Sequence, residues 1–506
     1  MREHEDVSSP SRRYLALAGL VSGVAGIVVS VALANLLNAR VNPIQAVGQE
    51  VIAKTPGPVA EALIHVVGRN DKPLLVTGVT VGILLLSVLA GVLSGKRPAY
   101  GVLVFVAMGV VALLAAMAHP GFSPVTLIPI AAGVGAWIIA LSLTVEQAPR
   151  SLTDPSRRAF LVRVGAVAAA AALVGVGGEV FGRARRAVDA SRARLHLPVS
   201  GGTVPAGAQI DLPGITPWRV SNNAFYRIDT ALSLPAVDPA TWRLRIHGMV
   251  DREVTLDYQD LLRRRLTQDW ITICCVSNPV GGNLIGNAWW SGVRIADVLA
   301  EAGVQPGATA VLQTSKDGWT CGTPVEALTD GRNAMLAIAM NGQPLPVEHG
   351  FPVRMIVPGL YGFVSATKWL VDLEVTTYDR FSAYWTQRGW SAQAPIKTES
   401  RVEVPGNGAS VPAGRVRVGG SAWAQHTGIA KVEYRLDGHP WQVADLGRVP
   451  SVDTWVQWVG VVDAAPGDHK VAVRATDRSG YTQTAVQVGV VPNGATGWDT
   501  ISFTAT

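Results

Sequence analysis

The first third of the chain is dominated by long apolar windows. Four of them carry no charged residue and are long enough to cross a hydrocarbon core of about 30 Å, at about 1.5 Å of helix rise per residue. A fifth, weaker window at about Ala159–Gly182 crosses only if Arg163 and Glu179 extend toward the two interfaces. We therefore predict an all-α transmembrane bundle of five spans over residues 1–182. The four uncharged windows cover about Tyr14–Leu36, Pro73–Ser94, Pro98–Ala118 and Phe122–Val145.

Basic residues in the short connections predict the orientation of this bundle, because lysine and arginine concentrate in cytoplasmic loops. The N-terminus is then cytoplasmic, and everything after Gly182 lies outside the cytoplasmic membrane. The loop at Asn38–Lys72 and the turn at His119 would also be external. Thinly spread basic residues in that loop, and the run Arg183–Arg194, conflict mildly with this orientation. The residues that support it are Arg2, Arg12, Arg13, Lys96, Arg97, Arg150, Arg157 and Arg158.

The connection before the fifth window reads Ser156-Arg157-Arg158-Ala159-Phe160-Leu161 and resembles a twin-arginine export signal. The alternative is an ordinary basic loop. Twin-arginine export moves folded domains, so it suits a protein that acquires a cofactor in the cytoplasm. No convincing cleavage site follows. We therefore expect an uncleaved anchor at residues 156–161 and beyond.

From about Val402 the pattern changes to short runs that are apolar at every second position. Two examples are Lys431–Leu436 and Lys470–Arg474, separated by turns such as Asp437-Gly438. Alternation of this kind between turn residues is typical of an antiparallel β-sandwich. We predict such a sandwich over residues 401–506.

The segment between bundle and sandwich mixes both patterns. A strand-like run at Trp242–Ile246 and a helix-like run at Ile295–Ala302, with Gly303 as its stop, indicate an α+β domain. We place this domain at residues 183–400. The predicted fold class is therefore multi-domain: a helical transmembrane region, an α+β domain and a terminal β-sandwich.

Composition narrows the function classes. Charged residues make up 16% of the 506 residues, against about 25% in typical soluble domains. The net charge of +6 is spread over both halves of the chain, so no dense basic patch supports nucleic-acid binding. The three cysteines, two of them adjacent, exclude a disulfide framework and a zinc finger.

The candidate chemistry gathers around Cys274 and Cys275, since dinucleotide, nucleotide, serine-hydrolase and zinc-protease motifs are all absent. The two thiols end an apolar run, and a glycine-rich turn follows them. Basic residues adjoin similar turns at His349–Arg354 and Gly359–Trp369. A thiolate suits a soft metal, and Arg or Lys suits phosphate. The thiols and basic residues together indicate a site for a metal with an anionic organic carrier. The alternative is that the cysteines are buried packing residues and that the arginine loop is structural.

At these residues the chain resembles the sulfite-oxidase family of molybdopterin-dependent oxidoreductases. The resemblance runs from about Thr216 to Ser400, and more weakly into the sandwich, which resembles the family's immunoglobulin-like dimerisation domain. It implies an α+β molybdopterin domain with molybdenum bound by one molybdopterin and one protein cysteine. The matching stretches occur in the family's order: Val237–Leu244, Cys275–Asn278, Asn341–Pro346, His349–Arg354 and Lys368-Trp369.

The resemblance also implies roles for single residues. The Cys-x-x-Asn motif makes Cys275 the metal ligand, while Cys274 and Cys321 are expected to be buried packing thiols. Arg227 stands where sulfite oxidases place an arginine that faces the metal, so Cys275 and Arg227 are the candidate catalytic residues. Periplasmic methionine-sulfoxide reductases of this superfamily have a similar stretch here. The cofactor-binding residues that this similarity implies are Asn223, Tyr226, Cys275, Thr314, His349, Arg354, Ala366, Thr367 and Lys368.

Three departures from the family pattern bear on the substrate. Sulfite oxidases have two arginines where this chain has Pro279 and Val280, and an active-site tyrosine where it has Ile338. Their Ala-Arg-Trp stretch is Ala288-Trp289-Trp290 here. A site built for a small oxyanion would lose affinity without these polar groups. We expect oxygen-atom transfer on an S-oxide, an N-oxide or another small substrate, with sulfite dehydrogenation as the alternative.

The chain has no C-x-x-C-H motif, so the electron carrier is expected to be a separate one of the quinone or cytochrome type. No haem is expected in the spans either, because the only histidines of that half are His4, His65 and His119. The expected partners are a small-molecule substrate and membrane lipid, and the sandwich could pair two chains as a homodimer. Two other functions remain open: a non-catalytic cell-surface module and an integral membrane electron-transfer protein.

Overall fold

The computed structural model describes residues 10–37, 42–55, 71–118, 122, 124–146, 148–149, 156–177, 179–231 and 234–506. The chain forms two compact units, residues 1–188 with 231–233 and residues 189–230 with 234–506. His4, His65, the turn at His119 and most of the predicted external loop lie outside the described residues.

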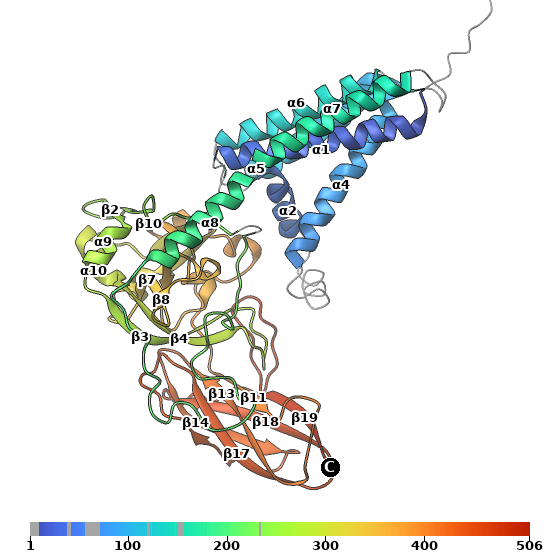
Figure 1. Ribbon diagram of the computed structural model, residues 1–506. Helices are drawn as coiled ribbons and strands as arrows, with labels where there is room; N and C mark the ends of the chain where they lie inside the picture. The colour runs from blue at the N-terminus through green and yellow to red at the C-terminus, as the bar shows by residue number, and fades with distance from the viewer. Residues whose placement is uncertain are drawn as a thin grey trace, which may run out of the picture. The chain divides into compact units, whose positions relative to one another are not determined.

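The first unit is helical (Figure 1). In the described part of the chain, four helices are long and apolar enough to cross a membrane: Arg12–Leu36, Pro73–Ser94, Pro98–Ala118 and Pro124–Val145. They coincide with the four uncharged windows. The fifth window forms helix α7, whose side chains are described only as far as Ala172, so its crossing stays a prediction. The helices are α1 (Arg12–Leu36), α2 (Pro43–Lys54), α4 (Asp71–Ser94), α5 (Pro98–Ala118), α6 (Leu127–Val145) and α7 (Ser156–Gly177).

Helix α1 is the central helix of this unit and packs against α4, α6 and α7. Glycine residues of α1 allow this close helix packing. Gly19 lies against Gly91 of α4, and a Cβ on Gly91 would come within 2.8 Å of the Gly19 Cα atom. Trp137 of α6 donates its indole N–H to the Gly23 carbonyl at 3.0 Å. Small residues let helix backbones approach closely where the hydrophobic effect between helices is weak.

The contact between α1 and α4 gives a prediction with a control on the same helix. Gly91→Leu should disrupt the packing, because a side chain there would collide with the backbone of α1. Gly78→Leu should be tolerated, since no atom lies within 4 Å of a Cβ at that position. The yield of monodisperse protein in detergent measures both. Equal yields would show that α1 and α4 do not pack through this contact.

Helix α8 (Glu179–Arg194) carries the chain into the second unit. There Arg192 donates to the Leu345 and Pro344 carbonyls at 2.7 and 2.9 Å. Two sheets follow, in the orders β2-β1-β10-β5-β6 and β3-β4-β7-β8, with β9 paired to β7. Strand β1 is parallel to β10, and the other pairs are antiparallel. The strands are β1 (Arg243–Gly248), β2 (Val254–Asp257), β3 (Thr267–Cys274), β4 (Ile285–Arg294), β5 (Ala310–Ser315), β6 (Thr320–Pro324), β7 (Met335–Met340), β8 (Gln343–Pro344), β9 (Arg354–Ile356) and β10 (Leu370–Thr376).

Three short helices connect these strands: α9 (Tyr258–Arg263), α10 (Ile295–Ala302) and α11 (Val325–Thr329). Asp257 and Asp260 form a capping box at the start of α9. Helix α10 ends at Gly303, which adopts φ +71° as a left-handed C-cap. The predicted α10 helix and its glycine stop are therefore confirmed, as is the sheet-rich character of this segment.

The C-terminal region consists of two sheets, in the orders β11-β13-β17-β16 and β12-β19-β18-β14-β15 (Figure 1). One apolar core lies between them, with Val418 and Trp458 from the first sheet against Val432 and Val473 from the second. The predicted alternating runs lie in β14 and β18. The strands are β11 (Glu399–Val404), β12 (Ala409–Val411), β13 (Gly414–Trp423), β14 (Ile429–Leu436), β15 (Gln442–Val443), β16 (Asp445–Leu446), β17 (Val456–Ala464), β18 (Gly467–Asp477) and β19 (Asp499–Ala505).

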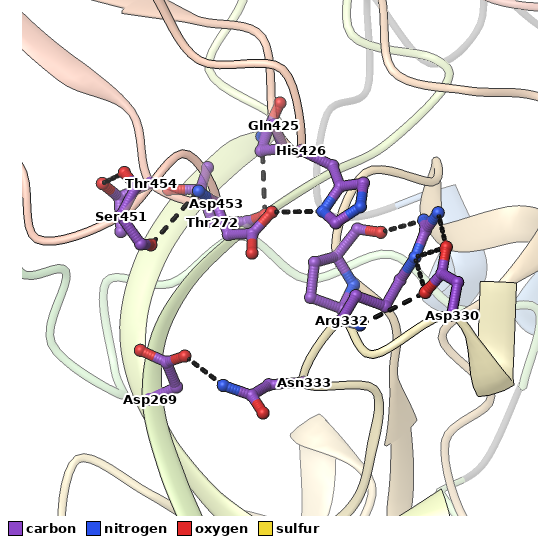
Figure 2. A network of polar contacts seen from close by, with 11 residues as sticks. Asp269, Thr272, Asp330, Arg332, Asn333, Gln425, His426, Ser451, Asp453 and Thr454 are labelled. Atoms are coloured by element: carbon purple, nitrogen blue, oxygen red, sulfur yellow. Dashed lines mark hydrogen bonds and ion pairs between the residues drawn. The ribbon is translucent and has the colours of Figure 1, made fainter. Parts of the chain in front are cut away.

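Two loops of the C-terminal region hold strand β3 at Thr272 (Figure 2). The Thr272 amide donates to the Asp453 carbonyl at 2.9 Å, and the Thr272 hydroxyl accepts from the Trp455 amide at 2.9 Å. The same hydroxyl donates to Asn287 of β4 at 3.0 Å. Gln425 donates to the Thr272 carbonyl at 3.4 Å. Thr272 thus ties β3 to β4 and to the C-terminal sheets at once.

A second set of polar contacts surrounds this attachment (Figure 2). His426 lies 3.2 Å from the Asp453 carboxylate and adopts φ +66°. Arg332 pairs with Asp330 at 2.6 Å and donates to the Pro358 carbonyl at 2.8 Å. Asn333 donates to Asp269 of β3 at 2.6 Å. Burial raises the pKa of Asp453, and the nearby His426 opposes that rise.

The Thr272 attachment predicts a stability effect. Thr272→Val keeps the shape of the side chain but leaves the buried Trp455 amide without its acceptor. We expect a loss of about 1–3 kcal/mol of unfolding free energy, the usual cost of an unsatisfied buried group. Thermal unfolding of detergent-purified protein measures it. The exposed Thr500→Val in β19 is the control, and equal midpoints for the two variants would contradict the proposed attachment.

Candidate active site

Cys275 stands where β3 ends and a tight turn begins. Its amide donates to the Leu284 carbonyl at 2.9 Å, and its carbonyl accepts from the Asn278 amide at 3.1 Å. The Asn278 side chain accepts from the Leu284 amide at 2.8 Å and closes the turn. A Cβ on Gly282 would lie 2.5 Å from that Asn278 oxygen, so the turn needs glycine there. The turn fixes Cys275 at the edge of a cavity.

The cavity has a volume of about 880 Å³, including its mouth, and lies within the second unit. Three loops form much of its wall, at residues 225–230, 315–319 and 385–390. Its aromatic lining residues are Phe225, Tyr226, Trp319, Phe363, Trp369, Trp385 and Trp390. Its charged and thiol-bearing lining residues are Asp229, Cys275, Asp317, Arg354 and Lys368.

The Cys275 thiol is buried and is held in its neutral form by its surroundings. Burial raises its pKa, while hydrogen bonding from Ser277 and the charge of Lys368 oppose that rise. A bound metal ion deprotonates a coordinating thiol outright. A metal at this sulfur would therefore supply the positive charge that the protein alone provides only weakly.

Two cations lie in the wall of the cavity. Arg354 is buried, donates to the His349 carbonyl at 3.1 Å, and lies 5.2 Å from the Trp290 ring centre. Its Nε atom has no hydrogen-bond partner, and it makes no ion pair with any described residue. Burial lowers its pKa to about 10. A buried guanidinium without a counter-ion is costly, so the site is built to receive an anion.

Lys368 is the second cation. Its ammonium lies 3.3 Å from the Asp229 carboxylate and donates to the Glu348 carbonyl at 2.9 Å. Burial lowers its pKa to about 8, and Asp229 opposes that change. Arg227 shares the same carboxylate at 3.1 Å. One Asp229 therefore serves two cations, and the positive charge is not fully balanced on this side of the cavity.

The structure brings together five of the residues that the sequence suggested, because Tyr226, Cys275, Arg354, Ala366 and Lys368 all line the cavity. Burial raises the pKa of Tyr226, with further contributions from Cys275 and Cys274, so its hydroxyl stays protonated and can donate a hydrogen bond.

The remaining suggested residues do not line the cavity. Asn223 and Arg227 are exposed, and Thr314 precedes the lining residue Ser315 in β5. His349 is buried and donates to the Asn222 carbonyl at 2.9 Å, and burial lowers its pKa to about 3. Thr367 is buried with its hydroxyl 3.3 Å from the Cys321 sulfur.

The departures noted in the sequence also lie off the cavity, since Pro279, Val280, Trp289 and Ile338 are absent from its lining. Sequence reasoning also missed Asp229 and Asp317, which add negative charge to a lining that contains Arg354 and Lys368. These carboxylates come from separate loops and belong to no local motif, so their placement depends on the tertiary fold.

Comparison with known proteins agrees with this geometry. Residues 231–385 match the family described as the oxidoreductase molybdopterin binding domain. An uncharacterized oxidoreductase of Bacillus subtilis, YuiH, is 33% identical over 153 residues, which cover 30% of this chain and 74% of that protein. The chain belongs to the sulfite-oxidase family of molybdopterin-binding oxidoreductases.

Human mitochondrial sulfite oxidase is 29% identical over 275 residues, covering 46% of this chain and 50% of that protein. The chain thus spans about half the length of the mitochondrial sulfite oxidases that it matches. Among solved structures, the sulfane dehydrogenase SoxCD of Paracoccus pantotrophus aligns with a TM-score of 0.48 and 22% identity, over 53% of this chain and 75% of that chain.

Family membership makes molybdenum with molybdopterin the cofactor, and the cavity residues fit it. The free Nε of Arg354 and the ammonium of Lys368 match a phosphate group. The thiol of Cys275 is a soft ligand suited to molybdenum.

A buried carboxyl group lies behind the two cysteines. Glu399, at the start of β11, is 2% exposed, and its Oε1 atom has no hydrogen-bond partner. Burial raises its pKa to about 8, Lys397 opposes this, and Asp499 adds to it. Its charge contributes, after burial, to the raised pKa of the Cys274 thiol.

Glu399 predicts a pH dependence of stability. Its folded pKa lies above the unfolded value of about 4.3, so between these values the folded state holds more protons and stability falls as pH rises. The unfolding free energy falls by at most about 1.4 kcal/mol for each pH unit in this range. Glu399→Gln replaces the titrating carboxyl group with a neutral amide. The melting temperature of this variant should therefore fall less than that of the wild type between pH 5 and pH 8. Parallel profiles would contradict the neutral buried carboxyl.

Proposed function

We propose that this chain is a membrane-anchored molybdenum oxidoreductase that acts outside the cytoplasmic membrane and removes an oxygen atom from an S-oxide or N-oxide. The observation that carries the proposal is the cavity at Cys275. There the buried Arg354 has no counter-ion among the described residues, and Lys368 is already paired with Asp229. Phosphate binding would occupy both cations. The described lining residues then offer no further cation to an oxyanion such as sulfite.

Bound molybdenum–molybdopterin supplies two-electron redox chemistry and oxygen-atom transfer. Cys275 would hold the metal through its thiolate, and Arg354 and Lys368 would hold the phosphate. The protonated Tyr226 hydroxyl is placed to donate to an oxygen atom in the cavity. Arg227 would act on the cavity only through its ion pair with the lining residue Asp229. Reduction of an S-oxide breaks the S–O bond, adds two electrons to sulfur, and releases the oxygen as water after uptake of two protons.

The remaining parts of the proposal concern the setting of the enzyme. Electrons come singly from a separate carrier of the quinone or cytochrome type. Residues 1–182 anchor the chain with the N-terminus in the cytoplasm, and the Ser156–Leu161 stretch serves as an uncleaved twin-arginine signal. Asn223, Thr314, His349 and Thr367 support the cofactor from positions outside the cavity wall. Residues 183–400 form the molybdopterin domain, and residues 401–506 form an immunoglobulin-like sandwich that pairs two chains.

The second candidate function is sulfite dehydrogenation, favoured by the similarity to mitochondrial sulfite oxidases. Substrate assays separate the two. Purified protein is supplied with S-oxides and N-oxides and a reduced dye, or with sulfite and an oxidising dye. Turnover of oxides with little sulfite activity supports the proposal, and the reverse pattern replaces it with the alternative.

Metal analysis tests the role of Cys275. Elemental mass spectrometry of the wild type should give about one molybdenum per chain. Cys275→Ala should alter the Mo(V) resonance and reduce activity by more than about 100-fold, since loss of groups that merely support metal ligands costs up to that much.

Cys321→Ala is the matched control, because this buried thiol lies off the cavity. It should keep both the resonance and the metal content. Protein that lacks molybdenum when made in a host that supplies the cofactor would support the non-catalytic surface module instead.

A further inference from the structure

One wall of the cavity carries a carboxyl group that forms no ion pair with the described residues. Asp317 lines the cavity and accepts from the Trp319 amide at 3.2 Å. It makes no ion pair with any described residue, in contrast to Asp229, which pairs with Lys368. Burial raises the pKa of Asp317, and the nearby Asp229 adds to the rise. A carboxyl group in this setting gains from a positive charge brought in by a ligand.

Aromatic rings surround the same space. Trp385 and Trp390 pack at 6.1 Å between ring centres with planes at 72°, and Phe363 lies 5.7 Å from Trp390. All three rings line the cavity and are partly exposed, as is Trp319 on the Asp317 loop. Aromatic faces attract ammonium groups, more strongly when water is excluded.

The basic side chain of the 385–390 loop packs outside the cavity lining. Arg388 lies between Trp385 and Trp390 in the sequence, but its guanidinium packs over the Tyr384 ring at 3.7 Å and donates to the Tyr384 carbonyl at 2.7 Å. It does not line the cavity. Among the described residues that line the cavity, Arg354 and Lys368 are therefore the only cations that share this space with the rings and Asp317.

We propose that Trp385, Trp390, Phe363 and Asp317 form a binding site for a positively charged alkylammonium group carried by the substrate. The inference rests on the proposed function and narrows its substrate class to oxides that bear a trialkylammonium group. Phosphate binding uses Arg354 and Lys368, which leaves the negative charge of the Asp317 wall to select the substrate. The same wall repels small oxyanions.

Two sulfoxides of the same shape test the site. One is methyl 2-(trimethylammonio)ethyl sulfoxide, and the other is methyl 3,3-dimethylbutyl sulfoxide, in which carbon replaces the charged nitrogen. Binding to the molybdenum-loaded full chain is measured by titration calorimetry, and turnover is measured separately with a reduced dye. The charged probe should bind about tenfold more tightly, a difference of about 1.4 kcal/mol.

Two variants test whether Asp317 and Trp390 cause the preference for the charged probe. Asp317→Asn and Trp390→Leu should each lower the binding ratio of the two probes toward one. Asp445→Asn, an exposed carboxylate of β16, is the matched control and should keep the wild-type ratio. If Trp390→Leu fails to fold, Asp317→Asn and displacement of the charged probe by tetramethylammonium on the wild type decide the question.

The outcomes for the two proposals are distinct. Equal binding of the probes by the wild type, or a ratio unchanged in Asp317→Asn, overturns the ammonium site whether or not the sulfoxides are reduced. Preferential binding of the charged probe without turnover of either sulfoxide supports the site but counts against the proposed reductase. Preferential binding with turnover supports both.

Discussion

The position of strand β3 is the constraint on which the site depends. Its antiparallel pairing with β4 fixes one edge, and Thr272 fixes the strand to loops of the C-terminal sheets through three hydrogen bonds. Cys275 lies three residues further on, at the cavity. Movement of the C-terminal region would therefore shift the candidate metal ligand directly. In this chain the C-terminal sheets hold the active-site strand in place, whatever they contribute to pairing of chains.

The charge balance of the cavity makes cofactor binding part of folding. Arg354 has no counter-ion among the described residues, and Lys368 shares Asp229 with Arg227. A buried cation without a partner charge destabilises the folded state, and an anion that pairs with it removes part of that cost. A ligand that binds only the folded state raises stability by mass action. The two buried cations that suit a phosphate would thus make the stability of the domain depend on the bound anion.

How far the sequence predicted this structure depends on whether each feature is local. Apolar windows and alternation are local, so four apolar helices, α10 with its Gly303 stop, and strands β14 and β18 could be read directly. Cys275, Arg354 and Lys368 were found through motif resemblance. Asp317, Trp385 and Trp390 could not be found, because loops distant in sequence bring them together. The departures at Pro279 and Ile338 were noted, but their position off the cavity required the fold.

The division of the cavity between strand ends and loops explains how one fold can serve different substrates. The groups suited to the cofactor lie on or beside regular structure: Cys275 follows β3, Arg354 begins β9, and Lys368 precedes β10. The groups that would meet the substrate lie on loops, at Asp317 and at residues 385–390. Loops tolerate substitution far better than the strands that support them. Substitutions in the loops can therefore alter the charge and shape of the cavity. The residues suited to the cofactor, which include the buried cations, stay unchanged.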